Sequence, residues 1–328
     1  MPLNMLEYPY RACTHGYLTL LARSEQSEQA KRADGRQDYQ SVRCSNGRFS
    51  KIIMDNKETK LTKKVYSTSV SGEWNRLVKD PFRELEFLTT FFFLKKYLPK
   101  NGLILDAGGG PGRYTIELAK LGYDIILFDL VAEHLELAKK QIKKEKVANK
   151  VKDIVQGSIT DLSKFADNSF DAVLCLGGPL SHVHPETERQ KAISELVRVA
   201  KTGAPIFTSV MSKYGVMLAT PAGWPQEVGF KKHFQNLVEN GEDYKWRGSG
   251  YCHYFTSDEL AKMFLKENVE IISKVGLEGL NVDDKVTNRF AKKFPEAWKN
   301  WLEIHMQICT EPFIVDASGH MMIIARKK

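Results

Sequence analysis

The stretch Leu103-Ile104-Leu105-Asp106-Ala107-Gly108-Gly109-Gly110-Pro111-Gly112-Arg113 decides the fold of this chain. An apolar run ends in an acidic residue, and four glycines follow within five residues. Residues 114–121 then resume the apolar spacing of a helix. Glycine lets the backbone adopt positive φ angles and approach a ligand without contact from a Cβ atom. We therefore predict a buried strand, a ligand-binding loop and a helix, with the ligand over the helix N-terminus.

The spacing of the glycines argues against two common nucleotide-binding motifs. In a dinucleotide fingerprint, G-x-G-x-x-G, the third glycine would fall on Arg113 when counted from Gly108, and on Thr115 when counted from Gly110. A P-loop would continue with Gly-Lys-Ser or Gly-Lys-Thr, and this loop does not. We therefore expect neither a dinucleotide nor a P-loop nucleotide in this loop.

Two acidic residues at strand ends indicate the kind of ligand. Asp106, at the mouth of the loop, would repel a phosphate but suits a ligand that carries an ammonium group. Asp129 ends the next apolar run, residues 124–128, where a carboxylate can accept hydrogen bonds from both ribose hydroxyls. Together these positions predict a nucleoside with a cationic tail.

The sequence D-A-G-G-G-P-G at residues 106–112, followed by a strand that ends in Asp129, resembles class I S-adenosylmethionine-dependent methyltransferases of the ubiquinone and small-molecule type. The resemblance runs from about residue 66 to residue 328 and is strongest over 103–210. It implies a doubly wound α/β fold, with a mostly parallel seven-stranded sheet, an antiparallel C-terminal strand and an N-terminal lid; an inserted cap is expected in addition. It also implies S-adenosylmethionine as the cofactor. A loop that serves only as a tight turn would leave the acidic strand ends unexplained.

We expect the cofactor to lie over loops at the carboxyl ends of the strands. One position departs from the family pattern, because Ser158 stands where many relatives carry an acid that contacts the adenine amine. The Ser158 hydroxyl or the Ile159 backbone could supply a neutral hydrogen bond there, while Asp161 could merely cap the following turn. The expected cofactor-binding residues are Asp106, Gly108, Gly110, Arg113, Asp129, Leu130, Ser158, Ile159, Leu176 and Gly177.

Two residues are candidates for catalysis. His182 lies in the loop after the strand expected at 170–176, and this loop should border both cofactor and substrate. An imidazole there could accept a proton from a substrate hydroxyl, amine or thiol, or it could cap a helix or bond a carbonyl. Tyr66 lies in the lid segment, where the resemblance implies an aromatic residue near the methyl group. Packing of this ring on the sheet is the alternative.

Residues 212–255 form an aromatic-rich insertion between the strand expected at 204–211 and the helix expected at 257–265. Such a segment is long for a plain connection, so it forms either a second small core or a cap over the substrate. We expect a cap, because loops at this edge of the sheet overhang the site. The expected substrate residues are Trp74, Trp224, Trp246, His253 and Tyr254.

The chain divides into three expected parts. Residues 1–62 are polar and basic with little apolar periodicity, and we expect a disordered or loosely attached extension. Residues 63–100 should form the N-terminal lid and a support helix over 83–97. Residues 101–328 should form the methyltransferase domain, with the cap insertion at 212–255.

The charge and the cysteines limit the partners of the protein. The formal net charge is +8, but residues 1–64 hold 12 of the 48 Lys+Arg and 7 of the 40 Asp+Glu, so most of the excess is N-terminal. A nucleic-acid partner is therefore not expected for the catalytic part. Five scattered cysteines without a C-x-x-C pair favour reduced thiols, and no metal site is expected. Without a membrane-length apolar stretch or a signal peptide, we expect a cytoplasmic protein; its oligomeric state is open.

The expected function is transfer of a methyl group from S-adenosylmethionine to an O, N or S atom of a small molecule by in-line displacement. Positioning does most of the work in such a reaction, so an obvious base is not required. Two alternatives stay open. The chain could methylate RNA or protein through its basic N-terminal segment, or it could bind S-adenosylmethionine without catalysis.

Overall fold

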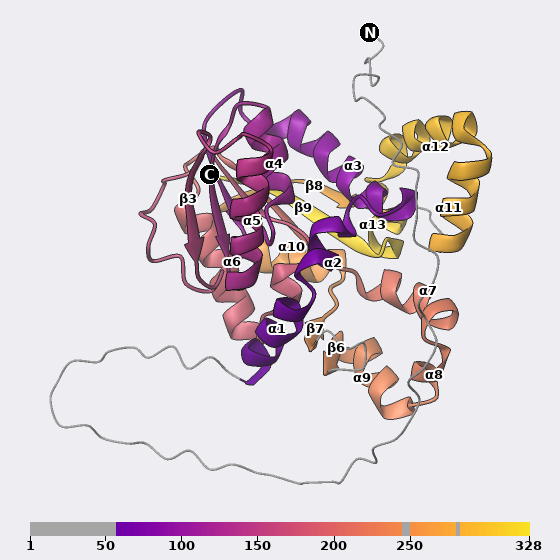
Figure 1. Ribbon diagram of the computed structural model, residues 1–328. Helices are drawn as coiled ribbons and strands as arrows, with labels where there is room; N and C mark the ends of the chain where they lie inside the picture. The colour runs from indigo at the N-terminus through magenta and orange to yellow at the C-terminus, as the bar shows by residue number, and fades with distance from the viewer. Residues whose placement is uncertain (1–56, 245–249, 280–282) are drawn as a thin grey trace, which may run out of the picture. The chain divides into compact units, whose positions relative to one another are not determined.

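The structure, a computed structural model, describes residues 57–244, 250–279 and 283–328. A seven-stranded sheet has the strand order β3-β2-β1-β4-β5-β9-β8 (Figure 1). Neighbouring strands are parallel from β3 to β5, whereas β9 is antiparallel to both β5 and β8. The predicted sheet, with its antiparallel C-terminal strand, is therefore confirmed. The strands are β1 (Leu103–Ala107), β2 (Asp124–Asp129), β3 (Val151–Gln156), β4 (Ala172–Cys175), β5 (Pro205–Met211), β8 (Val269–Gly276) and β9 (His320–Lys327).

Helices cover both faces of the sheet, because side chains alternate between the faces along each strand. On β1, Ile104 packs in the core formed with α3, α4 and α5, whereas Leu105 packs in the core formed with α6 and α10. Two buried apolar layers therefore enclose the sheet. These helices are α3 (Pro81–Tyr97), α4 (Arg113–Lys120), α5 (Ala132–Lys144), α6 (Glu186–Val199) and α10 (Ser257–Phe264).

The strand order reverses between β1 and β4, so the loops after these two strands meet at one edge of the sheet. The 3₁₀ helix η1 (Pro179–His182) forms part of the loop after β4. A Cβ atom on Gly108 would lie 2.4 Å from Cγ of Pro179, and Gly108 has φ = 80°. Glycine is therefore required where the two loops touch.

The segment predicted to form the lid contains two short helices, α1 (Lys57–Thr68) and α2 (Val70–Arg76). The support helix α3 starts at Pro81, two residues before the predicted start, because Asp80 caps it by accepting a hydrogen bond from the Arg83 N–H at 3.1 Å. Most of the predicted extension, residues 1–56, lies outside the described residues. Its predicted end at residue 62 falls inside α1, where Thr62 is buried.

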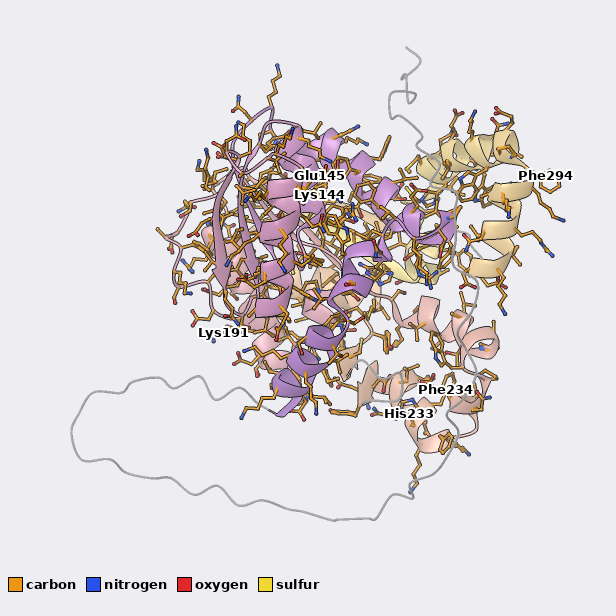
Figure 2. All side chains as sticks on the ribbon, viewed as in Figure 1. Lys144, Glu145, Lys191, His233, Phe234 and Phe294 are labelled. Atoms are coloured by element: carbon orange, nitrogen blue, oxygen red, sulfur yellow. The ribbon has the colours of Figure 1, made fainter. Side chains whose placement is uncertain are left out.

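The insertion has a small apolar core of its own. Leu237, Cys252 and Tyr254 are buried together, and Phe234 packs against them. Figure 2 shows Phe234 next to His233 on α9. The alternative of a second small core therefore applies to part of this segment, whereas the cap over a substrate stays a prediction. Its elements are α7 (Lys213–Gly223), α8 (Pro225–Val228), α9 (Lys231–Asn240) and the antiparallel strands β6 (Glu242–Tyr244) and β7 (Tyr251–His253).

Three further helices precede β9, in the region where the sequence indicated helices. They are α11 (Asp284–Lys293), α12 (Pro295–Ile308) and α13 (Pro312–Ala317). The buried side chains of Ala291 on α11 and Trp298 on α12 form a small cluster with Leu85 of α3. Over the described ranges, every helix is too short or too polar to cross a lipid bilayer.

Candidate functional site

Three hydrogen bonds connect the glycine-rich loop to the end of β2. The backbone N–H groups of Gly108 and Gly109 donate to the Phe128 carbonyl at 2.7 and 3.2 Å, and that of Gly110 donates to Oδ2 of Asp129 at 2.8 Å. The loop ends at Gly112, which has φ = 83°, and α4 starts at the next residue. The predicted sequence of strand, loop and helix is thus present, with the loop at the helix N-terminus.

Asp129 joins two loops. Its Oδ2 accepts the hydrogen bond from Gly110, and its Oδ1 accepts one from the Val131 N–H at 2.8 Å. The residue is only 6% exposed. A carboxylate oxygen can accept more than one hydrogen bond, so both oxygens keep capacity for the hydroxyl groups of a ligand. Contact with ribose stays a prediction, but the carboxylate lies at the predicted strand end.

Asp106 lies beneath the loop rather than at its mouth. Its side chain is fully buried, and a Cβ atom on Gly109 would lie 2.5 Å from its Cγ. Oδ2 accepts a hydrogen bond from the Thr115 hydroxyl at 2.6 Å, while Oδ1 has no hydrogen-bond partner in the described part of the chain. Burial raises the pKa of Asp106 to about 6. The unpaired Oδ1 is suited to a positively charged ligand group. The prediction that Asp106 lies at the mouth of the loop is wrong, because its side chain is buried beneath Gly109.

Arg113 and Trp74 bind each other. The Arg113 guanidinium lies 3.7 Å from the centre of the Trp74 ring, and Nη2 donates to the Trp74 carbonyl at 2.7 Å. Cations are attracted to the face of an indole, and this pair adds a hydrogen bond. Sequence reasoning assigned Arg113 to the cofactor and Trp74 to the substrate. In the structure their mutual contact holds α2 against the start of α4.

The two candidate catalytic residues form a hydrogen-bonded pair. The Tyr66 hydroxyl lies 2.8 Å from Nε2 of His182, and Nδ1 of His182 lies 2.8 Å from the backbone carbonyl of Tyr251. A carbonyl oxygen only accepts, so we assign the proton to Nδ1; Nε2 then accepts from the Tyr66 hydroxyl. Burial lowers the pKa of His182, partly offset by the Tyr251 carbonyl, and burial raises the pKa of Tyr66. Both side chains are therefore neutral near pH 7.

This pairing changes the role open to His182. Because both ring nitrogens already have partners, the imidazole cannot also contact a substrate without losing one of them. The Tyr66 oxygen donates its single hydrogen to His182 but can still accept a hydrogen bond. Of the two, Tyr66 is thus the group able to contact a substrate, and His182 orients it.

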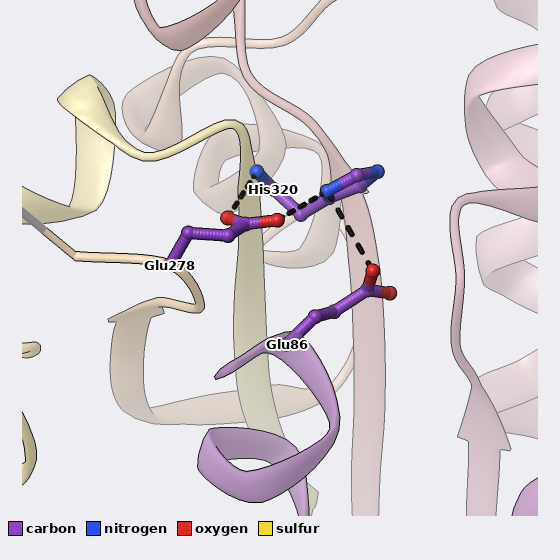
Figure 3. A group of neighbouring side chains, drawn as sticks. All are labelled: Glu86, Glu278 and His320. Atoms are coloured by element: carbon purple, nitrogen blue, oxygen red, sulfur yellow. Dashed lines mark hydrogen bonds and ion pairs between the residues drawn. The ribbon is translucent and has the colours of Figure 1, made fainter. Parts of the chain in front are cut away.

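A buried ionic cluster that the sequence did not reveal lies at the same edge of the sheet (Figure 3). Arg76 of α2 binds Glu86 of α3 through both terminal nitrogens, with Nη2 to Oε1 at 3.1 Å. His320 Nδ1 donates to Oε1 of Glu278 at 2.6 Å and lies 3.8 Å from Oε2 of Glu86. Burial alone would lower the pKa of His320, but the two carboxylates outweigh it and raise the pKa to about 9.

The position of this cluster connects the lid with the sheet. His320 starts β9 opposite Met211, which ends β5, so it lies at the carboxyl edge of the parallel strands. A Cβ atom on Gly177, in the loop after β4, would lie 3.2 Å from Nη2 of Arg76. Ligand atoms of Glu86, Glu278 and His320 lie within 4.8 Å of one another, as at a metal site. Arg76 and protonated His320 already balance the negative charges of the two carboxylates. An ion-pair network is therefore a better description of the cluster than a metal site.

The other expected cofactor residues follow β2, β3 and β4 and thus lie at the same edge. The Leu130 carbonyl accepts from the Gln156 side chain at 3.2 Å, and the Gly177 N–H donates to the Ser209 hydroxyl at 2.8 Å. Ile159 and Leu176 are buried. The Ser158 hydroxyl lies 2.9 Å from the Thr160 hydroxyl, and Asp161 accepts from the Ser163 N–H at 3.1 Å, as expected of a turn cap. Contact of these residues with a cofactor stays a prediction.

The expected substrate residues have other surroundings. His253 is buried between Glu242 and Glu259, at 3.2 and 2.7 Å from their carboxylate oxygens. Tyr254 is buried in the core of the insertion, and Trp224 is 45% exposed. Trp246 lies outside the described residues. The structure therefore gives His253 and Tyr254 a part in holding the insertion together, and it gives no support for their contact with a substrate.

Comparison with known proteins identifies the central part of the chain. A family profile described as a methyltransferase domain matches residues 104–203. Glycine/sarcosine N-methyltransferase from Aphanothece halophytica is 30% identical over 112 residues, which cover 34% of this chain and 41% of that protein. The protein of the same name from Halorhodospira halochloris is 25% identical over 169 residues, covering 51% and 52%. The ubiquinone/menaquinone biosynthesis C-methyltransferase from Zymomonas mobilis is 30% identical over 147 residues, covering 44% and 53%.

The chain spans about half the length of the curated relatives it matches. The matched residues 104–203 include the glycine-rich loop, Asp129 and the loop after β4, which together form the edge of the sheet described above. The mostly parallel seven-stranded sheet and its antiparallel β9 are what the sequence resemblance implies. Residues 104–203 therefore match a methyltransferase domain, in agreement with the sequence resemblance to S-adenosylmethionine-dependent methyltransferases.

Proposed function

We propose that the protein transfers a methyl group from S-adenosylmethionine to an O, N or S atom of a small molecule. The proposal rests chiefly on the position of Tyr66. Its ring contacts His182 and His134 edge to face, with ring centres 5.3 and 6.1 Å apart. His134 in turn lies beside Asp129 at the expected cofactor loop. Tyr66 therefore contacts the loop after β4 directly, and His134 connects it to Asp129 at the end of β2.

The residues at the loop fit the cofactor. The unpaired Oδ1 of Asp106 supplies a negative charge for the ammonium group, and Asp129 keeps hydrogen-bonding capacity for the ribose hydroxyls. Gly110, with φ = 56°, places no Cβ atom at the same position. When bound, S-adenosylmethionine supplies a methyl group that is activated by the positive charge on sulfur.

In this proposal Tyr66 positions the acceptor. Its oxygen accepts a hydrogen bond from an N–H or O–H of the substrate, while His182 holds the phenol in place through Nε2. Because burial keeps both groups neutral, the pair orients the nucleophile rather than removing its proton in the resting state. A neutral amine, or a hydroxyl or thiol that ionises easily, is the nucleophile that this arrangement suits.

A small acceptor agrees with the contact between the insertion and the pair. The hydrogen bond from His182 to the Tyr251 carbonyl joins η1 to β7, so the insertion takes part in the site's construction. Relatives named for glycine, sarcosine and ubiquinone methylation also favour a small acceptor. The cytoplasmic location and the absence of a nucleic-acid partner stay predictions from the sequence.

The test is to incubate the purified full chain with methyl-labelled S-adenosylmethionine and, separately, with a small-molecule extract, tRNA and a protein pool. We expect label in a small-molecule product and a large loss of this label with Tyr66→Phe. Label found only in tRNA or protein would support the macromolecular alternative. Cofactor binding without transfer to any pool would support a non-catalytic protein.

A further inference from the structure

His134, in the first turn of α5, has two unpaired nitrogens in a buried place. The residue is 4% exposed, and neither Nδ1 nor Nε2 has a hydrogen-bond partner among the residues that the structure describes. Whichever nitrogen carries the proton, one buried donor and one buried acceptor are left unpaired. Each such group destabilises the folded protein, because it has lost its hydrogen bond to water. Buried polar groups without a protein partner usually bind water or a ligand.

The surroundings of Nδ1 point to a ligand. Nδ1 lies 3.6 Å from Oδ1 of Asp129, which is too long for a hydrogen bond. A Cβ atom on Gly110 would lie 3.7 Å from Nδ1, so a side chain there would cover the nitrogen that glycine leaves open. On another side the ring meets Tyr66 of the lid edge to face. Nδ1 thus lies among the cofactor loop, Asp129 and the lid.

Asp129 cannot easily move toward His134. Its two oxygens are held by the backbone N–H groups of Gly110 and Val131, each at 2.8 Å, so closing the gap would strain one of these bonds. A ligand hydroxyl group could bind between the two side chains. If Nδ1 of His134 carries the proton, the hydroxyl accepts from this N–H and donates to the Asp129 carboxylate; if Nδ1 is unprotonated, the hydroxyl donates to it instead. Neighbouring hydroxyls on one ligand would satisfy both residues.

We propose that His134 is a specificity residue of the cofactor site, which binds a ribose hydroxyl of S-adenosylmethionine next to Asp129 and so selects ligands that carry this hydroxyl. This inference rests on the proposed function, since it takes S-adenosylmethionine as the ligand. His134 also gives the lid residue Tyr66 a direct contact with the part of the site that recognises the cofactor.

The experiment is calorimetric titration of the full chain with S-adenosylhomocysteine and with its 2′,3′-dideoxy analogue. His134→Phe keeps a ring against Tyr66 but removes both nitrogens, and His134→Gln restores one polar group. We expect His134→Phe to weaken binding of S-adenosylhomocysteine about tenfold, the effect of one hydrogen bond, and to leave binding of the dideoxy analogue unchanged. The Gln variant should recover part of the loss. Glu133→Gln, an exposed neighbour in the same turn, is the matched control and should change neither affinity.

The outcomes separate this inference from the proposed function. If the unaltered protein binds neither S-adenosylmethionine nor S-adenosylhomocysteine, both proposals are wrong. If it binds them but His134→Phe changes both ligand affinities by the same factor, or changes neither, only the role of His134 is overturned and water serves its nitrogens. Thermal unfolding of each variant checks that it is folded. Should the Phe variant be unfolded, the same two-ligand comparison with His134→Gln decides, since a ribose contact predicts a loss for the hydroxylated ligand alone.

Discussion

The Tyr66 hydroxyl donates to Nε2 of His182 over 2.8 Å. The opposite nitrogen of the same ring is bound to the Tyr251 carbonyl, which fixes the tautomer that makes this bond possible. Three distant segments of the chain, α1, η1 and β7, thus meet in one line of hydrogen bonds. These hydrogen bonds fix the position of the Tyr66 phenol oxygen.

The first prediction concerns the pH dependence of methyl transfer. Burial lowers the pKa of His182 and raises the pKa of Tyr66, so neither group of the pair changes its charge between about pH 7 and 8, below the pKa of His320. We expect Tyr66→Phe to lower the single-turnover rate roughly ten- to a hundredfold while the affinity for S-adenosylmethionine stays the same, because a positioning contact is lost. The rate of the unaltered protein over this range should follow only the ionisation of the acceptor. A rate change that persists with an acceptor that does not ionise would contradict a neutral pair.

The second prediction concerns proton release on cofactor binding. Asp106 has a pKa of about 6 because burial disfavours its charge, and a bound ammonium group would favour the charged form and lower this pKa. Affinity for S-adenosylmethionine should therefore rise from pH 5 to pH 7, with proton release near pH 6. Calorimetry in two buffers that differ in ionisation enthalpy measures this release. Asp106→Asn should bind more weakly and lose the dependence, and an equal dependence in that variant would assign it to another group.

The third prediction concerns stability at alkaline pH. The pKa of His320 is about 9 in the folded protein, above its unfolded value near 6.5, so its stabilising effect is complete below pH 6.5 and is lost as the pH rises through 9. The charged groups around it are Glu86 on α3, Glu278 after β8 and Arg76 on α2. Urea unfolding at pH 6.5, 8 and 9.5 should show a fall in unfolding free energy of up to about 3 kcal/mol. His320→Gln should be less stable at pH 6.5 and should show much less of this fall.

The fourth prediction separates the buried ion pair from an exposed one. Arg76→Met leaves the buried Glu86 carboxylate without its bidentate partner and should cost about 3–5 kcal/mol of unfolding free energy. Glu73→Gln removes the partly exposed ion pair of the same Arg76, at 3.2 Å, and should cost less than about 1 kcal/mol. Chemical unfolding of both variants measures the difference. Equal effects would mean that Glu86 is reached by water after Arg76 is removed.

The fifth prediction concerns the contact between the loops after β1 and β4. Gly108→Ala adds both backbone strain at φ = 80° and a clash with Pro179, since the new Cβ atom would lie 2.4 Å from Cγ. Gly122→Ala, at φ = 97° with no atom within 4 Å of the new Cβ, adds strain alone and is the matched control. We expect Gly108→Ala to abolish cofactor binding and Gly122→Ala to leave it intact, both measured by calorimetry. Normal binding by Gly108→Ala would show that the loops can separate without harm.

The family resemblance implied the seven-stranded sheet, and mostly apolar runs at residues 103–105, 125–128, 172–175 and 206–211 marked several of its strands. The glycine-rich loop and Asp129 were predictable because each belongs to a short stretch whose residues act together. The burial of Asp106 was not predictable, since it depends on Gly109 lying over the carboxyl group. A lone acid at a strand end looks the same in sequence whether it faces a ligand or the interior.

Long-range pairings account for the residues that sequence reasoning missed. Arg76 and His320 meet through Glu86, although 244 positions separate them in the sequence. Nothing in the local sequence of either residue indicates the other. His134 had the appearance of an ordinary helix residue, and only its unpaired nitrogens distinguish it. His253 did have a local signal, since its partners Glu242 and Glu259 are 11 and 6 residues away, but the aromatic neighbours suggested a substrate wall instead.

The acceptor for Nδ1 of His182 is a main-chain atom of Tyr251, whereas the Tyr251 side chain points its hydroxyl at Arg189, 2.5 Å away. The orientation of the His182 imidazole therefore depends on the course of the β7 backbone and not on the Tyr251 side chain. Substitutions of side chains in the insertion can change the shape and polarity of its surface. The orientation of Tyr66 need not change with them, because it depends on a backbone carbonyl. Side chains of the insertion can therefore change without a change in the hydrogen-bonded pair of Tyr66 and His182, provided that the backbone keeps its course at residue 251.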